Sequence, residues 1–224
     1  MLGAVREVPV QLEKSAALDK TAQTFGGVDI VVNNASAISI TNSQATDMKR
    51  FDLMHQINAR GTFVVSKFAV PFLEKSSNPH ILMLSPPLDL KEKWFAGCTA
   101  YSMAKYGMSL VALGLAGELR PRRIAVNALW PRTTIATSAI KNRRGDAAMR
   151  ACRTPDILAD AAHMIFLKDP KTFTGTFLID DTFLFENGVR HFDRYRVDPT
   201  VDLLPSMFVP DDSKPPVSLT RVTG

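Results

Sequence analysis

Short apolar runs alternate with longer helical patterns along most of this chain. β-branched and aliphatic runs predict buried parallel strands at residues 28–32, 80–85 and 124–129. Apolar positions at helical spacing predict long helices between them, at residues 51–72 and 101–119, and there is room for one helix before residue 33. Strands that alternate with helices in this way predict an α/β fold built on a parallel sheet.

The second half of the chain changes character twice. Thr154 and Pro155 form a helix start signal, and the helix is predicted to run to about residue 167. From Asp198 onward prolines accumulate without hydrophobic periodicity, which predicts a linker or tail. The expected organisation is therefore one domain over residues 1–197 and a proline-rich segment over residues 198–224.

Composition places the chain among intracellular globular domains, with 46% hydrophobic and 22% charged residues. No apolar run approaches the roughly 18 residues of a membrane span, so no membrane-spanning helix is expected. Cys98, Cys152 and four scattered histidines lack metal-ligand spacing, so no metal site is predicted. The net charge of +5 comes from short, separate basic clusters, including Arg143 and Arg144, which indicate solvated surface and not a nucleic-acid site.

One pair of residues carries the clearest chemistry. Tyr101 and Lys105 are four positions apart, which places them one turn apart on the same face of a helix. A phenol is a poor proton donor or acceptor at neutral pH, because its usual pKa is about 10. A neighbouring ammonium favours the phenolate and is expected to lower that pKa, so the pair is suited to acid–base catalysis at a hydroxyl or carbonyl group.

The motifs around this pair narrow the interpretation. Asn33-Asn34-Ala35 follows the first predicted strand, Asn58 lies in the long helix after it, and Pro131 follows Asn127 by four positions in the third strand and the turn beyond. With Tyr101-x-x-x-Lys105 between them, the chain resembles the short-chain dehydrogenase/reductase family over roughly residues 10–210. The resemblance implies a Rossmann-like, doubly wound parallel sheet, with a last strand at residues 173–180 and a substrate lid at residues 131–152.

The resemblance also implies catalytic roles. Tyr101 would be the general acid/base, and Lys105 would lower its pKa and hydrogen-bond the nicotinamide ribose. Asn58 would hold a relay water at a break in its helix. Ser85 is one place early for the family's substrate-orienting serine, whose position Pro86 takes, so Ser85 either orients the substrate or caps a turn.

The same resemblance implies the cofactor contacts. Asn33 and Ala35 would touch the adenosine side, and Pro131 with backbone groups through Thr134 would pack against the nicotinamide carboxamide. Tyr101 and Lys105 would contact the cofactor as well. The implied cofactor is NADP, with NAD possible. Trp130 either contacts the nicotinamide region or packs in the core, and Trp94 and Phe95 either line a substrate pocket or pack their loop.

One expected part of such a fold is not found in the sequence. Before Gly26 the only glycine is Gly3, so the sequence contains no glycine-rich turn that could bind a pyrophosphate. Compared with a complete fold of this kind, about two βαβ units are expected to be absent from the start. The strand at residues 28–32 should then have an unpaired apolar edge, which predicts poor solubility.

These observations support two functional hypotheses. By resemblance the chain is an NAD(P)-dependent oxidoreductase acting on a small apolar alcohol or ketone that is steroid- or fatty-acyl-like, with a peroxisomal or mitochondrial location. The alternative is a catalytically impaired, truncated form, either a non-functional remnant or an interaction module. In both cases the resemblance implies a homo-oligomer formed through the helices at residues 51–72 and 101–119.

Overall fold

The computed structural model describes residues 8–220, and the side chains of its first helix from residue 16. Its strands are β1 (Ile30–Asn33), β2 (His80–Met83), β3 (Ala125–Trp130) and β4 (Phe177–Ile179). Its α-helices are α1 (Val8–Phe25), α2 (Met48–His55), α3 (Gly61–Leu73), α4 (Thr99–Leu119), α5 (Ser138–Arg150), α6 (Asp156–Phe166) and α7 (Asp180–Glu186). Every strand and helix predicted from the sequence is present, and α5 and α7 are additional.

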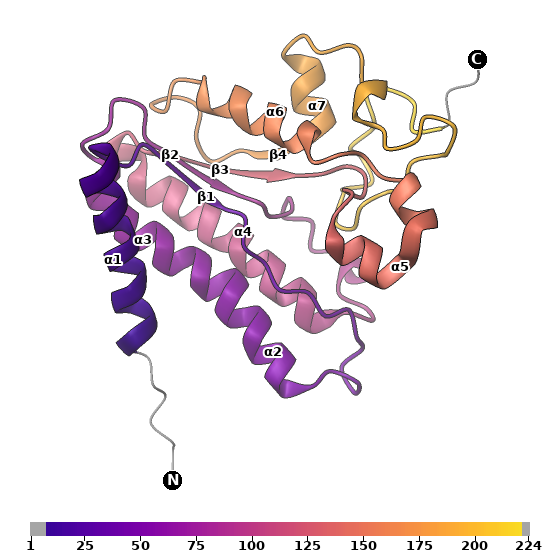
Figure 1. Cartoon of the computed structure of the whole chain (residues 1–224), viewed down its shortest axis with the longest axis horizontal. Helices are drawn as coiled ribbons and strands as arrows, with labels where there is room; N and C mark the ends of the chain where they lie inside the picture. The colour runs from indigo at the N-terminus through magenta and orange to yellow at the C-terminus, as the bar shows by residue number, and fades with distance from the viewer. Residues whose placement is uncertain (1–7, 221–224) are drawn as a thin grey trace.

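The four strands form one parallel sheet in the order β1-β2-β3-β4, which confirms the predicted α/β class. Helices cover both faces of the sheet (Figure 1). Each strand lies beside the one before it in the chain, always on the same side. The connecting helices α3 and α4 lie on one face of the sheet, whereas α6, which connects β3 to β4, lies on the other face. The β3–β4 connection is therefore of opposite hand to the first two, although parallel crossovers are right-handed in nearly all proteins.

Alternation along the strands gives each sheet face its own core. Val31, Ile81 and Val126 point toward α3 and α4, with the other residues of that cluster. Leu82 and Leu129 point toward α6 and α7. All six residues of β3 are buried, which is expected of a central parallel strand with helices on both faces.

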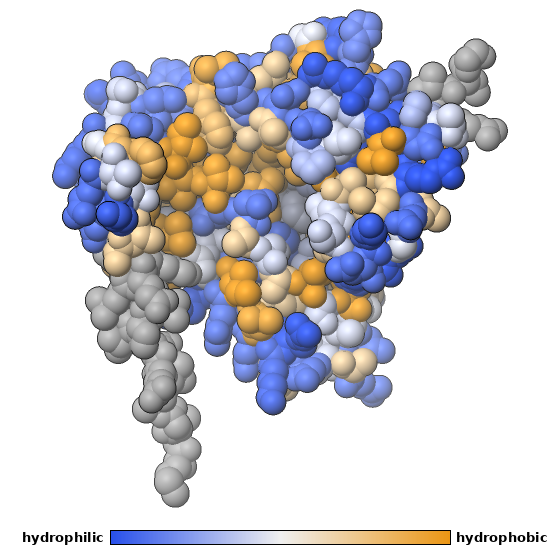
Figure 2. Space-filling view, in the orientation of Figure 1, coloured by the Kyte–Doolittle hydropathy of each residue, from blue (hydrophilic) through white to orange (hydrophobic). Residues whose placement is uncertain are grey.

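Strand β1 is covered on one face only. Its residues alternate between exposed and buried, with Val31 buried and Ile30 and Val32 exposed. Within the described residues no strand pairs with its outer edge, as expected for the strand predicted at residues 28–32. Figure 2 shows apolar surface gathered over this part of the sheet, between α1 and α6.

The long helix predicted at residues 51–72 is interrupted. Between α2 and α3 lies a π-helical segment, Gln56–Arg60, with the fully buried Asn58 at its centre. Such π-bulges occur frequently at functional sites. Helix α4 approaches the segment closely at Gly107, where a Cβ atom would lie 2.8 Å from the Ala59 Cβ. A side chain at Gly107 would therefore push the two helices apart.

The segment predicted as a tail from residue 198 packs against the domain, which corrects that interpretation for residues up to 220. The amide of Thr134 donates to the Leu204 carbonyl, and Thr133 pairs with Pro205 in an antiparallel bridge. The Phe208 side chain is fully buried. The prolines explain the absence of regular structure here, but they do not prevent burial.

Phe208 fills the centre of an aromatic cluster. Its ring centroid lies 5.4–6.0 Å from those of four aromatic residues, namely Trp94, Tyr101, Tyr106 and Trp130. Of these rings, Tyr101 belongs to the predicted site, and Trp130 was expected either beside the nicotinamide or in the core. The C-terminal segment thus supports the residues that were expected to perform the chemistry.

We expect Phe208→Ala to lower the free energy of unfolding by about 3–5 kcal/mol, because it removes a fully buried aromatic ring. Urea unfolding at neutral pH measures this change. Leu167→Ala is the control, since Leu167 is 72% exposed and its truncation should change stability little. An effect of Phe208→Ala no larger than that of the control would show that the segment is not part of the folded domain.

Candidate active site

A cavity of about 330 Å³ opens at the carboxyl ends of the strands. Asn34 and Ser36 follow β1, Leu84 follows β2, and Trp130 with Pro131 comes from the end of β3. Helix α4 contributes Tyr101 and Lys105, and α5 with the C-terminal segment closes the remaining wall. Ligands of open α/β sheets bind at this edge, so the cavity lies where the fold favours a ligand.

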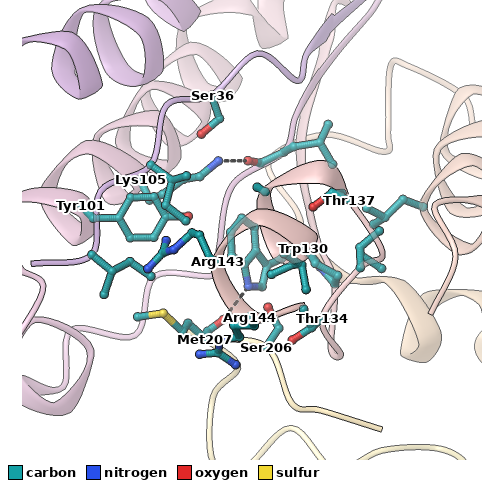
Figure 3. Close-up of a pocket in the computed structure, with 18 of the residues that line it drawn as sticks. Ser36, Tyr101, Lys105, Trp130, Thr134, Thr137, Arg143, Arg144, Ser206 and Met207 are labelled. Carbon is teal, nitrogen blue, oxygen red and sulfur yellow. Dashed lines mark hydrogen bonds between the residues drawn. The ribbon is translucent and has the colours of Figure 1, made fainter. Parts of the chain in front are cut away.

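Tyr101 and Lys105 lie in the first two turns of α4 and line the cavity together (Figure 3). Both side chains are buried, at 6% and 4% exposure. The Lys105 ammonium donates to the Leu84 carbonyl at 3.1 Å and lies 5.3 Å from the centroid of the Trp130 ring. The predicted pairing on one helix face is therefore present in the structure.

The electrostatics of the pair differ from the expectation. Burial raises the pKa of the Tyr101 phenol above its usual value, the Arg143 guanidinium opposes that rise, and Cys98 adds to it. Burial also lowers the pKa of the Lys105 ammonium from 10.5 to about 8. Desolvation of the phenolate is the largest influence on the Tyr101 pKa, and the charge that lowers this pKa is the Arg143 guanidinium and not the Lys105 ammonium as predicted.

Asn58 holds the loop that follows β1. Its side-chain oxygen accepts from the Ala37 amide at 2.8 Å, and its side-chain nitrogen donates to the Ala37 carbonyl at 3.0 Å. The predicted helix break is present. Both polar atoms of the side chain are engaged by one residue, so Asn58 fixes the backbone beside the cavity wall formed by Ser36 and Ile38.

Ser85 does not reach the cavity. Its side chain is fully buried, its hydroxyl has no hydrogen-bond partner among the described residues, and the preceding Leu84 lines the cavity instead. Ser85 lies beyond the end of β2, and its backbone amide donates to the Met83 carbonyl at 3.0 Å, so the chain turns at this point. The hydroxyls that line the cavity besides that of Tyr101 belong to Ser36, Thr134, Thr137 and Ser206.

Both predicted adenosine-side residues also lie outside this cavity. Asn33 is buried, and its side-chain nitrogen donates to the Ser66 hydroxyl on α3 at 3.1 Å. Neither Asn33 nor Ala35 is among the residues that line the cavity, whereas Asn34 and Ser36 are. The Asn-Asn-Ala motif therefore anchors β1 to α3 and presents the alternate residues to the cavity.

Pro131 and Thr134 line the cavity, and a buried ionic cluster holds their loop. The Arg132 backbone amide donates to Asp180, and its side chain donates to Asp181 at 2.7 Å. Arg153 donates to the other oxygen of Asp181 at 3.0 Å. All four side chains are at most 3% exposed. Sequence reasoning missed this cluster, although the adjacent acidic residues at the end of a predicted strand were a signal.

Arg143 and Arg144 were interpreted as surface charges, yet both line the cavity. They come from α5, which continues past a kink at Gly145, where the backbone has a φ of 74°. Trp130 packs in the aromatic cluster, as one of its two interpretations predicted, and it also lines the cavity. Trp94 does not line it, and its indole nitrogen donates to Asp89 at 2.8 Å.

The cavity can accept the nicotinamide end of a dinucleotide. Of the three Lys105 N–H donors, one meets the Leu84 carbonyl and another faces the Met108 sulfur at 3.7 Å, which leaves a donor for a ribose hydroxyl. Apolar walls from Trp130, Pro131 and Ile135 suit a flat aromatic ring. No group of three or more potential metal ligands occurs within residues 8–220, and no helix there could cross a bilayer.

Comparison with known proteins agrees with this arrangement. A family model described as enoyl-(acyl carrier protein) reductase matches residues 7–179. The chain belongs to the short-chain dehydrogenase/reductase family. Hydroxysteroid dehydrogenase-like protein 2 from Xenopus tropicalis and from Mus musculus are each 50% identical to it over 208 residues. That match covers 93% of this chain and 49% and 42% of the two relatives, so the chain spans about half the length of the curated relatives it matches.

Solved structures of the family share the fold. A Xanthomonas campestris protein is 49% identical with a TM-score of 0.86, over 90% of this chain and 74% of its own. A short-chain dehydrogenase homologue from Mycobacterium thermoresistibile is 45% identical with a TM-score of 0.84, over 92% and 73%. The Rossmann-like sheet of the short-chain dehydrogenase/reductase family is therefore confirmed for this chain.

Lys105→Met should stabilise the protein at pH 7. The folded pKa near 8 lies below the unfolded value of 10.5, so the folded state disfavours the charge at every pH below 8. That difference corresponds to at most about 3 kcal/mol, and we expect a gain of about 1–3 kcal/mol in urea unfolding because one hydrogen bond is lost.

The pH dependence of the free energy of unfolding tests the lowered Lys105 pKa independently. Between pH 8 and 10.5 the unfolded chain binds more protons at Lys105, so this group makes wild-type stability rise with pH in that window. Lys105→Met should remove that rise, whereas Lys67→Met, at an exposed position of α3, should retain it. A variant less stable than wild type at pH 7 would contradict the assignment of a costly buried ammonium.

Proposed function

We propose that this chain is an NAD(P)-dependent oxidoreductase that interconverts an apolar ketone and its alcohol, with Tyr101 as the general acid/base. The observation that carries the proposal is the burial of Tyr101 and Lys105 on the wall of one cavity at the carboxyl edge of the sheet. Membership of an oxidoreductase family supports the same reaction class.

The state of Tyr101 favours proton donation. Burial raises its pKa, so the phenol is protonated at neutral pH and can give its proton to a carbonyl oxygen. The reduced nicotinamide, when bound, supplies the hydride to the carbonyl carbon. The products are an alcohol and a tyrosinate, which regains its proton from solvent.

Lys105 stabilises the tyrosinate. Its ammonium is held in place by the Leu84 carbonyl and the Trp130 ring, so it needs no reorganisation when negative charge develops on Tyr101. Because the Lys105 pKa is about 8, this support is lost as the pH rises past that value. Asn58 keeps the adjoining loop in place through Ala37, a positioning role.

The substrate is proposed to be small and largely apolar, steroid- or fatty-acyl-like. Aliphatic and aromatic side chains from four parts of the chain line the cavity, among them Ile40, Trp130, Ile140 and Met207. Ser206 and Thr137 offer hydroxyls that could replace the absent substrate-orienting serine. The names of the relatives favour a steroid-like compound.

NADP is the cofactor we propose, with NAD as the alternative. A short-chain dehydrogenase from Burkholderia cenocepacia, which shares this fold at 24% identity, is a complex with NADP. In this chain Lys105, Pro131 and Thr134 would hold the nicotinamide end. A peroxisomal or mitochondrial location remains a prediction from the family resemblance.

A second candidate function is an interaction module that pairs with another copy of the fold. Apolar side chains of α3 and α4 are exposed, with Phe63 at 46%, Leu110 at 58% and Leu113 at 50%. Such a patch on neighbouring helices favours association. A homo-oligomer through these helices would be compatible with either function.

Tyr101→Phe tests the catalytic proposal. We expect it to lower kcat for NADPH-dependent reduction of a medium-chain methyl ketone by roughly 100-fold or more, because the proton donor is lost. NADPH affinity, measured by fluorescence titration, should change less than threefold. In the wild type, kcat/KM should fall above a pH of about 8 as Lys105 loses its proton.

Other outcomes would overturn the proposal. A folded wild-type chain that binds neither NADPH nor NADH cannot be the oxidoreductase, and dimerisation in the same sample would then favour the interaction module. Full activity in Tyr101→Phe would remove Tyr101 from the mechanism. Lys105→Ala should weaken both NADPH binding and turnover, which distinguishes its role from that of Tyr101.

A further inference from the structure

We propose that the substrate carries an anionic group, such as a carboxylate, which Arg143 and Arg144 bind at the rim of the cavity. This inference rests on the proposed function and narrows its substrate from a neutral apolar ketone to an amphiphilic one. The carbonyl would lie at Tyr101, the apolar body along Trp130 and Met207, and the anion at the arginine pair.

The charges on the cavity wall have a single sign. Three cationic side chains line it, those of Lys105, Arg143 and Arg144, and no Asp or Glu is among the lining residues. Most of the other lining residues are apolar. A hydrocarbon ligand would gain nothing from two guanidinium groups at the rim, whereas an amphiphilic anion can use both the apolar walls and the charges.

Neighbouring arginines show that pairing is available in this region. Arg150, on the same helix, forms an ion pair with Asp198 at 2.8 Å, and Arg153 is paired with Asp181 at 3.0 Å. Arg143 and Arg144 form no ion pair with any acidic side chain of the described residues. Their planar donors are thus available for a ligand, and guanidinium geometry suits bidentate binding of a carboxylate.

The position of Arg143 places the anion on the substrate side. Its charge lowers the pKa of the Tyr101 phenol, so the guanidinium lies close to the proposed proton donor. In the close-up, Arg143 lies between Tyr101 and Trp130, and Arg144 lies with Met207 and Ser206 (Figure 3). Ser36 is drawn on the other side of Lys105. An anion held by the arginines would therefore be near the reacting carbonyl and not beyond the nicotinamide.

Calorimetric titration of the full chain with octanoate and with octanol tests the proposal. The two probes share a hydrocarbon chain and differ in their head group. We expect octanoate to bind roughly tenfold more tightly than octanol, and the Arg143→Ala/Arg144→Ala double variant to lose that preference. Lys141→Ala is the matched control, because Lys141 is an exposed cation of the same helix that does not line the cavity.

Three results would overturn the proposal. The first is that octanoate and octanol bind to the wild type with equal affinity. The second is that Lys141→Ala weakens octanoate binding as much as the double variant does, which would indicate only a general positive field. The double variant could also weaken NADPH and leave octanoate unchanged, which would assign the arginines to the cofactor phosphates.

Turnover of neutral ketones separates this proposal from the proposed function. Circular dichroism establishes that the double variant folds. If wild type reduces a neutral ketone but shows no arginine-dependent preference for acids, only the present inference fails. If it binds octanoate through the arginines yet reduces no carbonyl compound with NADPH or NADH, the proposed function fails.

Discussion

The buried cluster of Arg132, Arg153, Asp180 and Asp181 is the constraint on which the site depends. Removing such charges from water costs several kcal/mol per ion. Asp181 is paired with both Arg132 and Arg153, whereas Asp180 Oδ2 and Arg153 Nε have no hydrogen-bond partner among the described residues. The Asp180 oxygen that accepts from the Arg132 amide fixes the loop behind Pro131. Arg132 also donates to the Ser213 carbonyl and so fastens the C-terminal segment. The end of β3, the start of α7 and residues 203–213 are thereby held together.

This constraint explains how an irregular, proline-rich segment contributes to the cavity. With residue 213 fixed by Arg132, Phe208 can fill the aromatic cluster beneath Tyr101, and Met207 and Ser206 reach the cavity wall. Burial and the charge of Asp181 raise the pKa of Asp180 to about 7, although Arg132 and Arg153 oppose the rise. The loop that would contact the nicotinamide is therefore held by a carboxyl group whose pKa lies near neutral pH.

Local patterns and the family resemblance were enough for the fold and for the placing of Tyr101 and Lys105. The apolar runs located three of the four strands, the family resemblance located the last, and the four-residue spacing placed Tyr101 and Lys105 on one helix face. The pattern could not show how strongly burial changes their pKa values, because desolvation is set by residues distant in sequence such as Phe208 and Trp130. For the same reason, the sequence pattern did not show that Arg143 and Arg144 line the cavity, because their position depends on where α5 lies relative to the sheet.

The central claim is that this cavity brings a carbonyl, the Tyr101 phenol and a nicotinamide together. A crystal structure of the chain soaked with NADPH and a non-reacting acid amide tests it most directly. The account predicts the nicotinamide against Pro131 and Thr134, with its ribose on Lys105 and the amide oxygen within hydrogen-bond distance of the Tyr101 hydroxyl. A cofactor bound elsewhere, or a ligand oxygen turned away from Tyr101, would contradict it.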